Sequence, residues 1–92
     1  MNEPEYRKVY VDVTVLMRKD GTLLPKSFRW EDGEKYPIDR VLHITPAASL
    51  KVGGRGTRYT VKINGMERYM FREEDRWFVE APIIREENDL KT

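Results

Sequence analysis

Two tight-turn signals, Asp20-Gly21 and Asn64-Gly65, constrain the fold of this chain more than any other feature. Asparagine, aspartate and glycine accept the positive φ angles that two-residue hairpin loops require. Each signal lies between stretches in which apolar and polar residues alternate, and this period of two is typical of half-buried strands. A weaker turn signal is present at Glu31-Asp32-Gly33. The sequence therefore predicts a small antiparallel β domain.

The alternation on either side of Asp20-Gly21 favours a two-residue loop. That loop pairs Val13 with Phe28, so that the apolar side chains share one face, whereas a three-residue loop sets Val13 opposite Ser27. Pro25 has no N–H to donate, so we expect it at an edge position or a bulge.

The other two turns favour different loop lengths. Around residues 31–33 a three-residue loop with Gly33 left-handed pairs Phe28 with Tyr36 and keeps the aromatic residues on one face. The alternation then breaks near Asp39-Arg40, which predicts a bulge or a sharp bend. Around Asn64-Gly65 a two-residue loop is expected.

We predict a single β domain over residues 1–92, with flexible ends at 1–5 and 85–92. About six antiparallel strands in two meanders are expected to form a small SH3-like or OB-like barrel or a strongly bent sheet. Residues 46–50 are expected to form one short helical turn. The expected core comprises Val9, Val11, Val13, Val15, Phe28, Trp30, Tyr36 and Ile38, together with Tyr59, Val61, Ile63, Met70, Trp77 and Val79.

Composition excludes several classes of protein. The chain has no cysteine, so disulfides, thiolate metal sites and cysteine nucleophiles are impossible. Its net charge of +1 argues against a dedicated polyanion binder. The start of the chain has no basic and apolar signal-peptide pattern, and no apolar run has the length of a membrane span. We therefore expect a cytoplasmic location and no contact with a membrane.

The aromatic hairpin pattern carries a resemblance. Phe28-x-Trp30-x-x-Gly33-x-x-Tyr36-x-Ile38, followed by Arg76-Trp77-Phe78-Val79, is similar to small uncharacterised bacterial all-β domains with a Trp-x-x-Gly-x-x-Tyr hairpin. The resemblance covers about half of the chain. It implies an all-β fold, and no functional residue is carried over from it.

The sequence holds no pattern typical of catalysis. His43 is the only histidine, and no second histidine or cysteine stands near it to complete a metal site. Ser27 and Ser49 lack the setting of an activated nucleophile. Gly53-Gly54-Arg55-Gly56 matches neither of the glycine-rich phosphate-binding motifs. We predict a protein that is not an enzyme and needs no cofactor or metal.

Two binding functions remain. The first is a binding or accessory module that contacts a protein partner or a second copy of itself; the residues expected at this contact are Tyr69, Phe71 and Phe78. The alternative is a weak nucleic-acid-binding module, because residues 51–62 contain four basic residues and no acidic one. The basic residues expected at the nucleic acid are Lys51, Arg55, Arg58 and Lys62.

Overall fold

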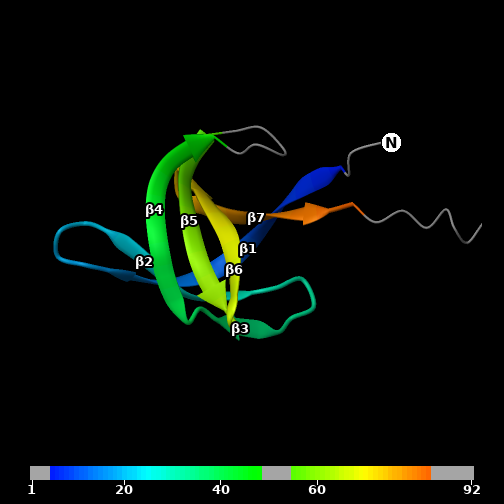
Figure 1. Ribbon diagram of the computed structural model, residues 1–92, viewed down its shortest axis with the longest axis horizontal. Helices are drawn as coiled ribbons and strands as arrows, with labels where there is room; N and C mark the ends of the chain where they lie inside the picture. Colours follow the sequence, from blue (N-terminus) through cyan, green and yellow to red (C-terminus); the bar gives the residue numbers. More distant parts are fainter. Residues whose placement is uncertain (1–4, 49–54, 84–92) are drawn as a thin grey trace, which may run out of the picture.

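The computed structural model describes residues 5–48 and 55–83, which form seven β-strands in the order shown in Figure 1. The strands are β1 (Tyr6–Met17), β2 (Leu23–Arg29), β3 (Lys35–Pro37), β4 (Arg40–Ala48), β5 (Arg55–Ile63), β6 (Met66–Glu73) and β7 (Arg76–Pro82). All neighbouring strands are antiparallel, and the sheet order is β3-β2-β1-β7-β6-β5-β4. The all-β prediction is confirmed.

The sheet curls into a half-barrel because β1 divides its pairing between two neighbours. Residues 6–11 pair with β7, and residues 12–17 pair with β2. The strand count is seven rather than the expected six, since the predicted strand after Gly33 is interrupted at Ile38 and Asp39. The Ile38 N–H donates to Lys26 of β2 at 2.9 Å, and the Asp39 N–H donates to Lys62 of β5 at 2.8 Å. The predicted break in alternation is thus the point where the chain changes partner.

The loop of the first hairpin differs from our prediction. Arg18 N–H donates to the Thr22 carbonyl at 2.9 Å, which leaves the three-residue loop Lys19-Asp20-Gly21 with Gly21 at a φ of 92°. A bulge then leaves Lys26 without a partner on β1, next to Pro25. This bulge restores the predicted pairing of Val13 with Phe28. The prediction of a two-residue loop was wrong because the extra loop residue and the unpaired Lys26 cancel in the register, so the pattern of faces is the same with and without them. A bulge, one of the two features expected at Pro25, is observed beside it.

The other two hairpins follow their predictions. Trp30 N–H donates to Glu34 at 2.9 Å, Gly33 has a φ of 86°, and Phe28 pairs with Tyr36. In the β5–β6 hairpin Asn64 and Gly65 have φ angles of 53° and 78°, as the two-residue loop requires. The entire predicted register from Ile63–Met66 onwards is observed.

The predicted helical turn is not formed in its described part. Residues 46–48 continue β4, where Pro46 pairs with Thr57 and Ala48 with Arg55. The ladder with β5 satisfies backbone groups that a helical turn would have used. Residues 49 and 50 lie outside the described residues, as do 51–54 of the glycine-rich segment.

The predicted ends at 1–4 and 85–92 also lie outside the described residues. Glu5, which we expected in a flexible end, accepts a hydrogen bond from Ile83 N–H at 2.8 Å and is thereby tied to β7. Among the described residues there is no helix of the length and apolar character needed to cross a membrane.

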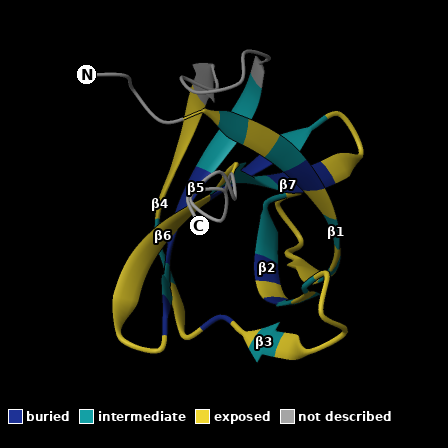
Figure 2. Ribbon diagram, turned by 90° about the vertical axis from the view of Figure 1, so that its right-hand side faces the viewer, coloured by how far each residue is buried: buried dark blue, intermediate teal, exposed yellow. Residues whose placement is uncertain are grey.

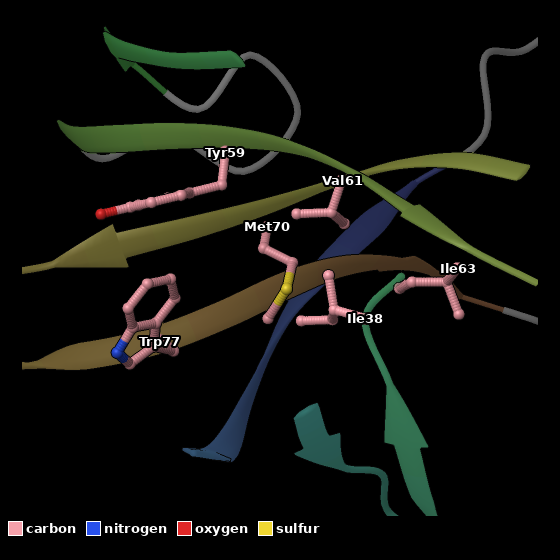
Figure 3. Packing of buried hydrophobic residues seen from close by; sticks show 6 residues of the cluster. All are labelled: Ile38, Tyr59, Val61, Ile63, Met70 and Trp77. Carbon is pink, nitrogen blue, oxygen red and sulfur yellow. The ribbon is translucent and has the colours of Figure 1, made fainter. Parts of the chain in front are cut away.

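The core lies inside the curl of the sheet (Figure 2). Its buried members are Ile38, Tyr59, Val61, Ile63, Met70 and Trp77, with the predicted Val11, Val13, Phe28 and Val79 packed against them. Figure 3 shows Met70 and Ile38 between the Tyr59–Trp77 pair and Ile63. The Tyr59 and Trp77 rings are 4.8 Å apart. Val15, which was expected in the core, is 38% exposed because the end of the β1–β2 hairpin projects beyond the half-barrel (Figure 1).

Candidate functional site

A cleft opens where β6 and β7 separate. The two strands pair only from Phe71–Phe78 to the turn at Glu74 and Asp75, so residues 66–70 and 79–82 have no ladder between them. The resulting cleft has a volume of about 590 Å³ and is called the β6–β7 cleft below. This volume falls within the range of about 300–1,000 Å³ that is usual for ligand-binding clefts.

Aromatic and apolar side chains line most of this cleft. Phe28 and Tyr36 stack with ring centroids 5.5 Å apart, and Trp30 lies beside them on the same hairpin. On the β6 side Met66 and Tyr69 are 54% and 52% exposed. Glu67, Arg68 and Glu80 are the charged residues of the lining. The cleft therefore presents apolar surface with little net charge.

The β6 wall of the cleft also presents backbone groups. Ile63 and Met66 flank a two-residue turn, so their backbone groups bond to each other. Hydrogen-bonded pairs alternate along an antiparallel ladder, so Arg68 and Met70 also direct their backbone groups toward β5. The N–H and C=O groups of Glu67 and Tyr69 consequently face the cleft, where the described chain provides no strand to pair with them. An extended peptide can pair with such an edge.

Tyr36 is also fixed by a polar contact. Its hydroxyl donates to Asp32 Oδ2 at 3.1 Å within the same hairpin. This hydrogen bond to the carboxylate raises the pKa of the Tyr36 phenol above its usual value. The contact holds the ring in place at the mouth of the cleft.

The three residues expected at a protein partner have different environments. Tyr69 is exposed and lines the cleft, and Phe71 lines it from a mostly covered position, with 4% exposure. Phe78 is 1% exposed and lies beneath Tyr10, Lys8 and the stacked ring of Phe71. Of the three, Tyr69 alone presents a large surface to a partner in this conformation.

Of the four basic residues of the expected nucleic-acid surface, the structure describes the side chains of Arg58 and Lys62. Lys51 lies outside the described residues, and for Arg55 only the backbone, within β5, is described. Arg58 and Lys62 share the outer face of β5, separated by Thr60. The Arg58 guanidinium lies 4.7 Å from the centre of the Tyr69 ring.

The outer face carries a second cation–aromatic pair. The Arg76 guanidinium lies 3.6 Å from the centre of the Tyr10 ring. Lys8 is 3.0 Å from Glu73 Oε1, and this hydrogen bond raises the pKa of Lys8. Both exposed tyrosine rings, Tyr10 and Tyr69, thus already hold a guanidinium on one face.

Among the described residues, the one histidine of the sequence does not lie in a metal-binding cluster. His43 is exposed on β4, and no group of three or more His, Asp or Glu side chains is placed to hold a metal among these residues. The β6–β7 cleft was not predicted from the sequence, because Trp30 and Tyr36, which line it, were assigned to the core. The periodicity that indicates burial does not distinguish a core residue from one that lines a cleft.

Comparison with known proteins gives no relative: no family model matches the chain, and neither the curated proteins nor the solved structures give a significant match. The resemblance of the Trp30–Tyr36 hairpin to bacterial all-β domains therefore stays a prediction.

Proposed function

We propose that this protein is a non-catalytic binding module that holds an extended segment of a partner protein in the β6–β7 cleft. The observation that carries this proposal is the combination, in one cleft, of aromatic lining and of β6 backbone groups at Glu67 and Tyr69 that no strand of the described chain pairs with. A strand added beside Glu67 and Tyr69 would form main-chain hydrogen bonds, and its alternate side chains would contact the aromatic wall. Affinity would come from the ladder and specificity from the pockets between the rings.

The chemistry of the lining favours an apolar segment. Phe28, Trp30 and Tyr36 offer ring surface, and Met66 offers a flexible side chain that adapts to different partners. The few charged residues lie close to electrical balance, so a strongly charged ligand gains little there. We expect apolar residues at alternate positions of the bound segment.

Nucleic-acid binding has weaker support from the geometry. Single-stranded nucleic acid is held by basic residues that follow the backbone and by aromatic rings on which bases stack. Here Tyr69 and Tyr10 each carry a guanidinium, and Phe71 and Phe78 are covered. A base would have to compete with Arg58 or Arg76 for the ring faces that these guanidinium groups cover.

The test is a selection of displayed random peptides on the whole protein, followed by affinity measurements with the recovered peptides. Met66→Glu places a charge in the cleft, whereas Met17→Glu changes another exposed methionine, 67% exposed, that does not line it. We expect Met66→Glu to weaken binding about tenfold or more, equivalent to about 1.4 kcal/mol. Met17→Glu should leave affinity within about a factor of two of the unmodified protein.

Two results would contradict the proposal. The first is a selection that recovers no specific peptide, and the second is equal affinity for the Met66→Glu and Met17→Glu variants. Amide NMR spectra recorded with a short single-stranded oligonucleotide at about 50 and 200 mM salt examine the alternative. Shifts around Arg58 and Lys62 that decrease at the higher salt concentration would favour nucleic-acid binding instead.

A further inference from the structure

A second cleft lies where β2 and β4 separate. At its closed end Ile38 bonds to Lys26 of β2, and Asp39 bonds to Lys62 of β5. Beyond this point β4 diverges from the first residues of β2, and no ladder joins the two in the described chain. The cleft has a volume of about 460 Å³ and is called the β2–β4 seam below. Its apolar lining comprises Leu24, Pro25, Ile38, Val41, Leu42 and Ile44.

The seam is bordered by positive charge. Arg18, Lys26 and Arg40 are exposed at its rim, and none of them forms an ion pair within residues 5–48 and 55–83. The lining contains a single carboxylate, Asp39, whose Oδ2 accepts a hydrogen bond from Gly65 N–H at 3.5 Å. The seam therefore has three cations against one anion.

The register adds to this excess of positive charge. Arg40 lies directly opposite Lys62 in the β4–β5 ladder. Like charges at directly opposed positions of a sheet destabilise it. Glu67 lies opposite Lys62 in the β5–β6 ladder and offsets part of this repulsion, and an anion bound beside Arg40 would relieve the rest. Outside the lining, Asp20 interacts electrostatically with Arg18, and Asp39 is the one carboxylate among the lining residues, so the seam favours an anionic ligand.

The β4 wall of the seam is a sheet edge. The backbone N–H and C=O groups of Val61 and Tyr59 bond to β6, so those of Thr60 and Arg58 bond to β4. The β4 partners of these two residues, His43 and Thr45, therefore direct their own backbone groups toward β5. The N–H and C=O groups of Ile44 therefore point away from β5. Pro46 occupies the next outward position and has no N–H, which limits the open edge to the part beside the cations.

We propose that the β2–β4 seam binds an extended acidic segment of a partner protein. The segment pairs with β4 at Ile44, and its carboxylates lie against Arg18, Lys26 and Arg40. A polypeptide fits better than a nucleic acid because a sheet edge binds another backbone, and the lining of the seam contains no Phe, Trp or Tyr ring. This site is separate from the β6–β7 cleft, so either proposal can fail without the other.

The probe is a short fluorescent peptide of alternating glutamate and valine, blocked at both ends. Its binding is measured by fluorescence anisotropy at low salt, and amide NMR maps the contact on the unmodified protein. We expect shifts at Leu24, Lys26 and residues 42–44 and a marked loss of affinity as salt screens the charges. A peptide with lysine in place of glutamate should not bind.

Two modifications separate the charge contacts from the edge pairing. Arg40→Glu should weaken binding about tenfold or more, because it places like charges together at the contact. Lys35→Glu makes the same change of charge at an exposed residue of β3 outside the seam and should leave binding nearly unchanged. A probe with N-methyl groups at alternate residues keeps its charge but loses backbone donors, so it should also bind about tenfold more weakly or worse.

Several results would overturn the proposal. These are absence of binding, equal binding of the lysine peptide, equal weakening by Arg40→Glu and Lys35→Glu, and full binding of the N-methylated probe. A short single-stranded oligonucleotide that shifts the same amides more strongly than the glutamate peptide would also overturn it, because the seam would then be a phosphate-binding surface.

Discussion

Ile38 and Asp39 are adjacent in the chain, yet their amide groups bond to strands on opposite sides of the β2–β4 seam. Ile38 N–H donates to Lys26 of β2, and Asp39 N–H donates to Lys62 of β5. Ile38 is also a buried member of the core, at 8% exposure. The residue that ends the first meander is therefore packed between both halves of the sheet.

Replacement of Ile38 by alanine is expected to destabilise the whole domain. Loss of a buried isoleucine costs about 2–5 kcal/mol, because it removes apolar contacts and leaves a cavity. Ile83→Ala is the matched control: Ile83 is 39% exposed at the end of β7, and we expect a change of less than about 1 kcal/mol there. Urea unfolding, followed by tryptophan fluorescence and by circular dichroism, measures the free energy of unfolding of both variants. Transitions that separate into two steps in the unmodified protein would show that the two meanders unfold independently.

Gly56→Ala should be among the most damaging single changes in the chain. A Cβ at residue 56 would overlap the carbonyl oxygen of Arg72 on β6, and the backbone has a φ of 154°. We expect a loss of about 3 kcal/mol or more, since backbone has to move.

Gly21→Ala separates backbone strain from steric overlap, the two causes of the stability loss expected for Gly56→Ala. Gly21 has a φ of 92° but open space around it, so alanine there meets backbone strain without a steric overlap. We expect a loss of about 1–2 kcal/mol. Thermal unfolding of the two variants gives the comparison, and equal losses would show that φ, rather than the approach of Arg72, governs residue 56.

Glu74→Asn is expected to stabilise the β6–β7 turn. Glu74 has a φ of 58°, a conformation that asparagine tolerates better than glutamate. The turn contact from Arg72 Nη1 goes to the Glu74 carbonyl, so the substitution does not remove it. We expect a gain of up to about 1 kcal/mol in urea unfolding. Glu34→Asn, an exposed residue without a positive φ, should give no such gain.

The Tyr36–Asp32 contact predicts a loss of stability at alkaline pH. The hydrogen bond to Asp32 raises the pKa of Tyr36 above its usual value of 10.0. A phenol whose pKa is higher in the folded state contributes stability that is fully present below pH 10.0 and is lost as the pH rises through the folded pKa. The free energy of unfolding, measured across this pH range, should decline more steeply for the unmodified protein than for Tyr36→Phe. Parallel curves would contradict the contact.

Local signals in the sequence were enough to predict where the hairpins lie, but not the loop length of the first hairpin and not the clefts. Asn64-Gly65 fixed the complete register of β5 and β6, because a two-residue turn and the alternation of faces leave one solution. At Asp20-Gly21 the same reasoning failed, since the bulge at Lys26 offset the extra loop residue. Neither irregularity alone is visible in the pattern of apolar residues.

The clefts depend on where strands separate, and strand separation is a tertiary property. The sequence gives no sign that β6 and β7 part beyond Phe71 and Phe78, because an apolar pattern along each strand does not show where its pairing with a neighbour ends. The basic rim of the seam was missed for a related reason. Arg18, Lys26 and Arg40 are distant in the sequence, whereas residues 51–62 hold four basic residues close together, so the basic surface was predicted there.

The link at Ile38 and Asp39 also limits how the β2–β4 seam can move. Two strands joined only by hydrogen bonds can part along their whole length, but β3 and β4 are joined by two residues of chain. β3 is paired with β2, so this end of the seam is held by the covalent chain between β3 and β4 as well as by hydrogen bonds. A guest segment therefore meets a tied end of the seam at Ile38 and Asp39, and an end without a ladder between the two strands near Leu24 and Ile44.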